Sequence, residues 1–389
     1  MMPARVRYMM RVLNTTSALV SRVPDEGREP ELTGIETHIE YVAAVERLSG
    51  RPLMPIAQRS MTVAFARAGA GIDAIAFREA PVPAPGAGEA LVRLKAATLN
   101  FRDLLAVGGK LPSTREPEYV PVSDASGEVV EVGEGVTRVK PGDRVSPLFS
   151  QGWLTGPKPS TRMLGGPIDG VARNYAVFDS ESLCLIPDEI GDMEAAAFPC
   201  AGLTAWNAVF GARPVKAGEW VLVQGTGGVS LAALQWAKAV GASVIVTSSS
   251  DSKLKRARAL GADITINYRT TPDWAGAARA ALGGRGVDIV VDVVGEAQTE
   301  DCARALADGG VISAVGRLEG TASWGKEVGR PVIPVIVGNR EQHERMLAFG
   351  AENRIRPVID AVYDLARLSA ALRLLESGRF FGKIGINLL

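Results

Sequence analysis

Short apolar runs alternate with turns in the first half of the chain and with helix-like segments in the second. After Met61, runs of three to seven residues are separated by Gly- and Pro-rich turns such as "APVPAPGAGEA". This pattern is typical of a β-rich domain. The strands expected there are Val63–Phe65, Ala74–Arg78, Ala90–Lys95 and Gly127–Val132, followed by a turn and strand at Val139–Val145.

After about Pro199 the rhythm changes to strand–helix alternation, which predicts a parallel sheet with right-handed crossovers. The expected strands are Trp220–Val223, Ser243–Thr247, Ile264–Asn267, Asp288–Val294, Val311–Val315 and Val332–Val337. The expected helices are Ser230–Val240, Ser252–Leu260, Asp273–Leu282, Gln298–Ala307 and Glu341–Ala351.

A glycine cluster lies where the first of these strands meets its helix, in "VQGTGGVSLAALQWAKA". Gly225 permits a sharp turn, and Gly227, with Gly228 beside it, lets the backbone approach a pyrophosphate. Val229 and Ser230 open a helix whose N-terminal amides favour an anion. Ser230 replaces the usual third glycine of the motif. The cluster predicts a dinucleotide site; the alternative is a tight turn without a ligand.

The end of the second strand distinguishes NADP from NAD. A carboxylate there would repel a 2′-phosphate by roughly 4 kcal/mol at 4 Å and an effective dielectric constant near 20. The chain instead reads "VTSSSDSK", which supplies Ser248, Ser249 and the cation Lys253, and Tyr268 closes the next strand. Asp251 lies beyond the strand end, where we expect it to cap the following helix. These residues favour NADP (NADPH).

Seven ordered motifs resemble the zinc-independent, quinone-oxidoreductase-like and alcohol dehydrogenase-like branch of the medium-chain dehydrogenase/reductase superfamily. They are "LNFRDLLAVGG", "SDASGEVVEVGEGVTRVKPGDRV", "FPCAGLTAWNAV", "VLVQGTGGVSLAALQWAKA", "LGADITINYR", "GVDIVVDVVG" and "SGRFFGKI". The resemblance implies an α/β fold with a GroES-like β-rich catalytic domain over residues 61–201 and 337–389. A Rossmann domain with a doubly wound parallel sheet would occupy residues 202–336.

Zinc-containing relatives hold a catalytic metal, and matching their motifs places the ligand positions at Asn100, Ser123 (followed by Asp124) and Cys200. A catalytic zinc needs three protein ligands, and a single thiol does not supply them. The four-cysteine loop of a structural zinc is also missing. His38 lies in the N-terminal extension and His343 is expected on an exposed helix face, so we expect no metal.

The resemblance also implies the nicotinamide end of the site. Thr204 and Val229 would pack near the ring, with Val315 and Val337 on its carboxamide side and Asn100 across the cleft. Lys383 falls where relatives reach towards a cofactor phosphate; the alternative is a solvated lysine at a strand end.

Two departures from the family pattern accompany this site. Gly385 replaces a β-branched residue in the closing strand, which would loosen it, and Asn339 stands where many relatives have serine.

Without a metal, the substrate must accept hydride with little help, as quinones and α,β-unsaturated ketones do. Positioning and a few hydrogen-bond donors then supply the catalysis. Asn100 is the first candidate donor, Arg102 the second, and Tyr175 a candidate proton donor. Asp103 is expected to hold its loop by a salt bridge, and Cys200 to be a small side chain beside the ring. Pocket walls are expected from Phe101, Trp153 and Trp206, for which core packing is the alternative.

Composition narrows the class of protein. Lys+Arg and Asp+Glu both number 43, so no net charge favours nucleic acid or a membrane surface. Three scattered cysteines indicate a reducing cytoplasm, and no apolar run is long enough to span a membrane. Residues 1–60 are arginine-rich at their start and are expected to be a poorly ordered extension, a leader ahead of Met61, or a transit peptide.

The leading hypothesis is a zinc-independent NADPH-dependent oxidoreductase that transfers hydride to a small electrophile, a quinone or an α,β-unsaturated carbonyl compound (enone); an aldehyde would be the substrate of the first alternative. The alternatives are an NADP-dependent alcohol/aldehyde dehydrogenase and a catalytically silent NADPH-binding sensor or structural protein. A homodimer through the apolar strand "RPVIPVIV" is also expected.

Overall fold

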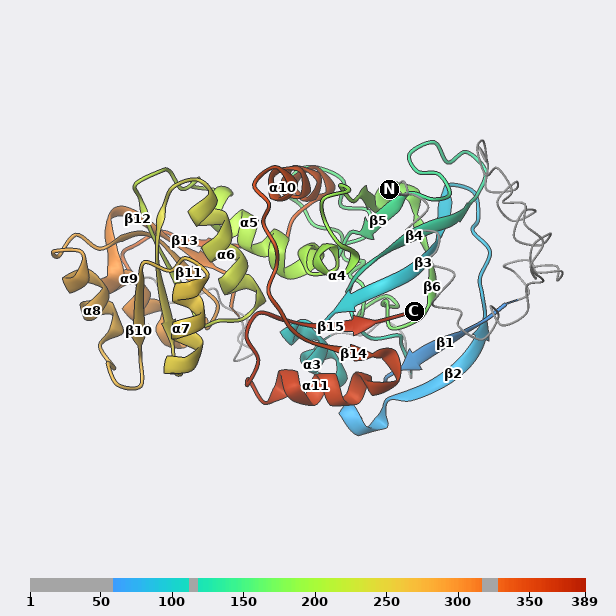
Figure 1. Cartoon of the computed structure of the whole chain (residues 1–389), viewed down its shortest axis with the longest axis horizontal. Coiled ribbons are helices and arrows are strands. Elements are labelled where there is room, and N and C mark those ends of the chain that lie inside the picture. Colours follow the sequence, from blue (N-terminus) through green and yellow to red (C-terminus); the bar gives the residue numbers. More distant parts are fainter. Residues whose placement is uncertain (1–58, 112–117, 317–327) are drawn as a thin grey trace, which may run out of the picture. The chain divides into compact units, whose positions relative to one another are not determined.

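The computed structural model describes residues 59–111, 118–316 and 328–389. The prediction for the N-terminal extension therefore lies outside the described residues, apart from its last two positions. Within them, most strands fall into a six-stranded and a seven-stranded sheet, which Figure 1 shows with their helices. No described helix is long and apolar enough to cross a membrane.

The six-stranded sheet is parallel and has the order β10-β9-β8-β11-β12-β13, which is the Rossmann order and confirms that part of the predicted fold class. Its strands are β8 (Trp220–Gln224), β9 (Ser243–Ser248), β10 (Ile264–Asn267), β11 (Val287–Asp292), β12 (Leu306–Ala314) and β13 (Val332–Pro334). The last strand is shorter than expected and ends at Pro334, although the Val335 amide still donates to the Ala314 carbonyl of β12 at 2.9 Å.

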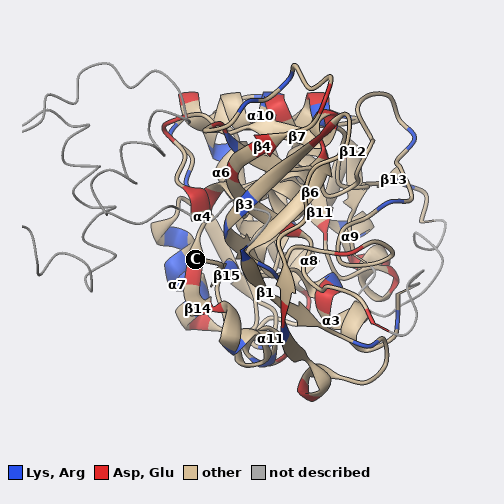
Figure 2. Ribbon diagram, turned by 90° about the vertical axis from the view of Figure 1, so that its right-hand side faces the viewer, with Lys and Arg blue, Asp and Glu red and all other residues tan. Residues whose placement is uncertain are grey.

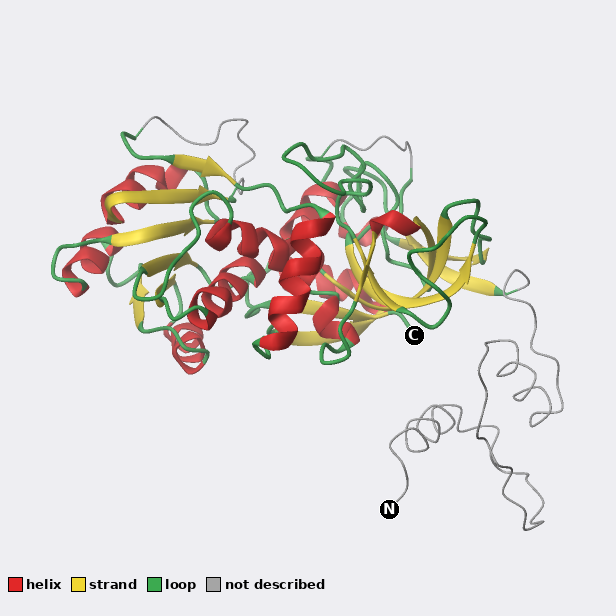
Figure 3. Cartoon of the chain, turned by 90° about the horizontal axis from the view of Figure 1, so that it is seen from above, coloured by secondary structure: helices red, strands yellow, loops and turns green. Residues whose placement is uncertain are grey.

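Helices cover both faces of this sheet (Figure 3). Alternate strand residues separate the faces: Val221 and Val223 belong to one core cluster, and Leu222 to another. The first face packs on α5 (Leu203–Phe210), α6 (Gly228–Ala239) and α7 (Asp251–Ala259); the second packs on α8 (Trp274–Ala281) and α9 (Thr299–Ala305). A strand with both faces buried reads as the continuous apolar run seen in the sequence.

The seven-stranded sheet has the order β14-β15-β3-β4-β5-β7, with β6 also paired to β3. Its strands are β3 (Glu89–Thr98), β4 (Asp124–Val132), β5 (Arg144–Pro147), β6 (Tyr175–Asp179), β7 (Leu183–Leu185), β14 (Ile359–Asp364) and β15 (Lys383–Asn387). A separate pair joins β1 (Ser60–Phe65) to β2 (Ala76–Pro81). The strand expected from Ala74 starts later, because Ile72–Ala74 forms a 3₁₀ turn.

Several helical segments lie beside this sheet, and apart from α10 the sequence pattern did not predict them. They are α3 (Phe101–Val107), α4 (Asp192–Ala195), the π-helical turn η4 (Phe198–Gly202), α10 (Arg340–Glu352, which was expected) and α11 (Leu368–Glu376). Acidic and basic residues are interspersed along the elements in Figure 2, in keeping with the zero net charge.

Candidate active site

The glycine loop has the geometry that its sequence predicts. Gly225 adopts a φ of 72°, in the region that favours glycine, and its amide donates to the Thr247 carbonyl at 2.8 Å. The loop leads directly into α6, whose first residue is Gly228. Ser230 is buried, and its hydroxyl donates to the Gln224 carbonyl at 2.6 Å. The residue that replaces the third glycine thus ties the helix to the strand.

This loop fits the pyrophosphate of a dinucleotide. A Cβ placed on Gly227 would meet no atom within 4 Å, so the backbone there faces open space. The first backbone amides of α6 have no hydrogen-bond partner within the helix. They form the positive end of the helix dipole, which faces this space.

The residues expected at the adenosine end lie at the carboxyl edge of the sheet. Ser248 ends β9, and its carbonyl accepts the backbone amide of Tyr268 at 3.1 Å. Ser250, rather than Asp251, caps α7 by accepting the amide of Lys253. Asp251 instead accepts a hydrogen bond from Asn267 at 2.7 Å, which corrects its expected capping role. Ser249 follows Ser248 and is partly buried.

Lys253 points towards the C-terminal part of the chain. Its Nζ donates to the carbonyl of Gly378 at 2.6 Å and lies 5.9 Å from the ring centroid of Phe380. The Lys253 side chain therefore reaches from the first turn of α7 to the segment that precedes β15.

The residues expected around the nicotinamide share one apolar cluster. Val229, Val315 and Val337 all pack in the core that covers α5 and α6, and Thr204 is 5 % exposed on α5. Asn339 caps α10 through a reciprocal pair of hydrogen bonds with Gln342, each of 3.0 Å. Asn339 therefore acts on the backbone that follows Val337.

A buried polar group, which we call the Lys383 cluster, comprises Asn100, Ser123, Asp124, Cys200 and Lys383. The Lys383 Nζ donates to Asn100 Oδ1 at 2.6 Å, and Asn100 Nδ2 donates to Ser123 Oγ at 3.2 Å. Ser123 donates to Asp124 Oδ1 at 2.9 Å, and Asp124 Oδ2 accepts the Cys200 amide at 3.1 Å. Lys383 is 4 % exposed, so the alternative of a solvated strand-end lysine is wrong.

Sheet register brings this cluster together. Thr98 pairs with Asp124 on β4 and with Gly385 on β15, so the end of β3 lies between the other two strands. Asn100 follows β3 and is the N-cap residue of α3, where its backbone N–H donates to Asp103 Oδ2 at 2.7 Å. Gly385 does not simply loosen its strand. A Cβ at this position would lie 2.5 Å from the sulfur of Met193 in α4, so the lack of a side chain makes room for that helix.

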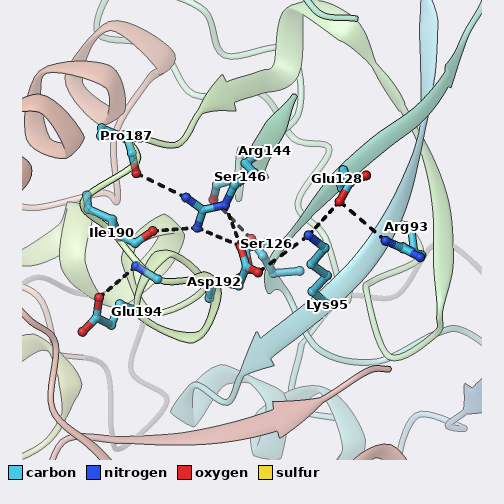
Figure 4. A network of polar contacts seen from close by, with 12 residues as sticks. Arg93, Lys95, Ser126, Glu128, Arg144, Ser146, Pro187, Ile190, Asp192 and Glu194 are labelled. Atoms are coloured by element: carbon cyan, nitrogen blue, oxygen red, sulfur yellow. Dashed lines mark hydrogen bonds and ion pairs between the residues drawn. The ribbon is translucent and has the colours of Figure 1, made fainter. Parts of the chain in front are cut away.

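An ion-pair network fixes the segment that carries Cys200 (Figure 4). Arg144 donates to Asp192 Oδ1 at 2.8 Å, and Lys95 lies 2.8 Å from Glu128 and 3.8 Å from Asp192. The network attaches α4 to the sheet, and η4 follows two residues after α4. It thereby sets the position of the turn whose amide binds Asp124.

The cluster does not fit a zinc ion. Asn100 and Ser123 are neutral, and a lysine occupies the same group. Burial raises the pKa of the Cys200 thiol above its usual range, and the nearby Asp124 carboxylate raises it further, whereas zinc binds the thiolate. Within residues 59–111, 118–316 and 328–389, no group of three His, Cys, Asp or Glu side chains could hold a metal.

His343 does not lie on an exposed helix face, as expected from sequence, but is fully buried in α10. Burial lowers its pKa to about 3. Neither ring nitrogen has a partner in the described part of the chain.

Neither Arg102 nor Tyr175 makes a hydrogen bond with the Lys383 cluster in the described residues. The Arg102 guanidinium donates to the carbonyls of Leu164 and Gly166 at 2.8 and 2.7 Å, so its hydrogens hold a loop. Tyr175 pairs with Arg93 on β3. Seven residues of extended strand, roughly 23 Å, separate that position from Asn100. The salt bridge expected of Asp103 is a 3.9 Å contact with Arg102.

The three aromatic residues expected in the pocket wall differ in their surroundings. Trp206 packs edge-on against Phe210, Trp236 and Phe349, which is core packing. Trp153 is 6 % exposed and donates to the Gly156 carbonyl. Phe101, beside Asn100, is 43 % exposed and is free to line a pocket.

Comparisons with known proteins agree with this architecture. Residues 86–188 match the family model for an alcohol dehydrogenase GroES-like domain, and residues 228–364 match that for a zinc-binding dehydrogenase. The chain is 38% identical over 333 residues to a zinc-type alcohol dehydrogenase-like protein of Schizosaccharomyces pombe, covering 82% of this chain and 96% of that one. It is 30% identical to the acryloyl-coenzyme A reductase of Metallosphaera sedula, covering 79% and 94%.

Solved structures give the same result. A putative alcohol dehydrogenase from Sinorhizobium meliloti superposes with a TM-score of 0.77 at 38% identity, covering 85% of this chain and 99% of that one. The quinone oxidoreductase from Coxiella burnetii superposes with a TM-score of 0.69 at 26% identity, covering 85% and 100%.

Proposed function

This chain belongs to the medium-chain dehydrogenase/reductase superfamily and is an oxidoreductase of its alcohol dehydrogenase-like kind, and from this premise we propose a more specific activity. The protein is an NADPH-dependent reductase that delivers hydride to a quinone or an α,β-unsaturated carbonyl compound without a metal ion. It works as a homodimer in the cytoplasm, with the exposed side of β13 at the edge of its sheet as the contact.

The Lys383 cluster is the observation that carries the proposal. A metal-dependent alcohol dehydrogenase polarises its carbonyl substrate with a Lewis acid, and the residues of this cluster fit a hydrogen-bonded network better than a metal. A substrate that disperses incoming charge over a conjugated system needs less polarisation, which favours quinones and enones over simple ketones.

The adenosine end supports NADPH over NADH. Ser248 ends β9 and Ser249 follows it, with no carboxylate on the strand, and Tyr268 is 43 % exposed just beyond the end of the adjacent strand β10. Asp251 is engaged by Asn267. Hydroxyl donors at this edge accommodate a 2′-phosphate, which an acidic residue would repel.

When bound, NADPH supplies the hydride. The chain's own residues orient the reactants and stabilise the charge that develops on the substrate oxygen. Asn100 is the donor best placed for this, since one Nδ2 hydrogen binds Ser123 and the second has no acceptor in the described residues. Arg102 and Tyr175 are left out of the mechanism, because Arg102 donates its hydrogen bonds to loop carbonyls and Tyr175, on β6, pairs with Arg93 in the middle of β3, seven residues before Asn100.

The names of relatives support two activities. An acryloyl-coenzyme A reductase and a quinone oxidoreductase are among them, and their names describe conjugated acceptors. Several others are named alcohol dehydrogenases, which favours NADP-dependent alcohol or aldehyde oxidoreduction as the second candidate function.

The test is NADPH oxidation by the purified protein against a panel of quinones, enones and aldehydes, with and without a zinc chelator. We expect turnover of quinones or enones that survives the chelator, less than stoichiometric zinc by elemental analysis, and a preference for NADPH over NADH. Turnover of simple alcohols with NADP⁺ and no enone activity would select the second candidate. Loss of activity with the chelator, restored by zinc, would refute the metal-free mechanism. Tight NADPH binding with no turnover would leave a silent binding protein.

A further inference from the structure

Lys383 is buried in the interior of the protein, and both of its hydrogen-bond partners are neutral. Its Nζ donates to the Leu99 carbonyl at 2.7 Å and to Asn100 Oδ1 at 2.6 Å. The nearest carboxylate oxygen, on Asp124, is 3.8 Å away, beyond hydrogen-bond distance. A buried charge is costly unless it is paired, and here the ion pair with Asp124 has no direct hydrogen bond. The cation is therefore available to act on the groups it touches.

The hydrogen bonds of the cluster run in one direction. An ammonium can only donate, so Asn100 must turn its oxygen to Lys383 and its NH₂ group to Ser123. Ser123 then donates to Asp124. A hydrogen bond from a cation to the amide oxygen polarises the amide and strengthens its N–H as a donor. The lysine thus sets both the orientation and the donor strength of Asn100.

The lysine also links this cluster to the glycine loop. A Cβ on Gly228 would lie 2.5 Å from Lys383 Cδ, so the side chain crosses directly over the first residue of α6. Next to it, the Gly382 amide donates to the Thr226 carbonyl at 2.9 Å. The ammonium therefore lies between the glycine loop and Asn100.

We propose that Lys383 is the fixed positive charge of this active site, a positioning residue that acts on the substrate oxygen through Asn100. The inference rests on the proposed reductase function. In that reaction hydride adds to the β-carbon of the enone, the C=C electron pair shifts towards the carbonyl, and negative charge develops on its oxygen. The side-chain N–H of Asn100, polarised by Lys383, stabilises this oxygen. A proton from water then adds to the α-carbon, and the nicotinamide cofactor, which has given up its hydride, is released as NADP⁺.

The experiment replaces Lys383 by methionine, which keeps the length of the side chain and removes its charge. We expect kcat for enone reduction to fall by about 100-fold, a loss typical of an impaired oxyanion donor. The dissociation constant of NADPH, measured by fluorescence titration, should stay within about 3-fold of wild type. These two expectations separate the proposal from a role as a cofactor phosphate ligand, which would weaken NADPH binding instead.

A spectroscopic measurement reads the polarisation without turnover. The carbonyl stretch of ¹³C-labelled cyclohex-2-enone, bound together with NADP⁺, should shift to lower frequency in wild type and return towards its solution value in K383M. Lys238→Met is the matched control, because Lys238 is also a partly buried lysine paired with a carboxylate, Asp263 at 2.9 Å, but it lies near the C-terminal end of α6, away from the Lys383 cluster. It should change neither the stretch nor kcat.

The double variant Lys383→Met/Asp124→Asn removes both charges of the buried pair and guards against misfolding. If the charge of Lys383 is needed, the double variant stays as slow as K383M. Wild-type kcat in either variant, or a 10-fold loss of NADPH affinity with kcat unchanged, would overturn the proposal. A wild-type protein that reduces no acceptor refutes the proposed function itself, before any variant is compared.

Discussion

Replacing Asp103 by asparagine should make the protein more stable at neutral pH relative to acidic pH. The carboxylate is fully buried. Its Oδ2 accepts a hydrogen bond from the backbone N–H of Asn100 at 2.7 Å, but Oδ1 has no hydrogen-bond partner in the described residues. The closest cation, Arg102 Nη1, is 3.9 Å away and spends its hydrogen bond on the Leu164 carbonyl. A charge so placed costs free energy that a neutral amide of the same shape avoids.

Burial raises the pKa of Asp103 from 3.8 to about 6, although Arg102 and the Asn100 amide both act to lower it. A difference of roughly 2 units corresponds to about 3 kcal/mol. Between these two pKa values the folded state binds the proton and the unfolded state does not. The free energy of unfolding therefore falls as the pH rises through this window. About 2 kcal/mol of the loss lies between pH 4.5 and pH 7.5.

The assay is urea unfolding of wild type and Asp103→Asn, followed by tryptophan fluorescence at pH 4.5 and 7.5. The free energy of unfolding of the variant relative to wild type should rise by about 2 kcal/mol between the two pH values. A difference that is independent of pH would refute the reasoning, whatever its sign. Glu118→Gln is the opposite control. Hydrogen bonds from Arg78 and Arg67 lower the pKa of Glu118 to about 2, so this variant should lose more stability at pH 7.5 than at pH 4.5.

Four other substitutions test separate parts of the structure. Gly228→Ala should lower both the midpoint of urea unfolding and the affinity for NADPH, because the new Cβ would lie 2.5 Å from Lys383 Cδ. Gly227→Ala places its Cβ in open space, so it should weaken NADPH binding and leave the unfolding midpoint unchanged. His343→Leu should flatten the pH dependence of urea unfolding between about pH 6.5 and pH 4, because the buried ring has a pKa of about 3 and must stay neutral, while the unfolded chain takes up a proton; an unaltered pH profile would contradict this. Ser249→Asp should raise the dissociation constant of NADPH relative to that of NADH by about 100-fold, since one like-charge contact costs up to roughly 4 kcal/mol. An unchanged ratio of the two constants would exclude Ser249 from the phosphate site.

The sequence by itself was sufficient for the parallel sheet and the glycine loop. Each βα unit is encoded by neighbouring residues: an apolar run buried on both faces, a turn, and a capped helix. Gly225 needs a positive φ whatever surrounds it, so its role is legible locally. The seven-stranded sheet was harder to predict, because its short strands take their partners from distant segments: β15, near the C-terminus, pairs with β3, and β6 pairs with β3 across more than 80 residues.

Only the tertiary structure decided what the polar residues do. The Lys383 cluster draws Asn100, Asp124 and Lys383 from positions far apart in the chain, and the registers of β4 and β15 against β3 bring them together. Side chains alternate along a strand, so a shift of one residue would turn Ile384 towards Asn100 and drive Lys383 into the apolar core. Burial of His343 has the same origin, since a helix pattern gives the spacing of its residues but not which face the rest of the protein covers.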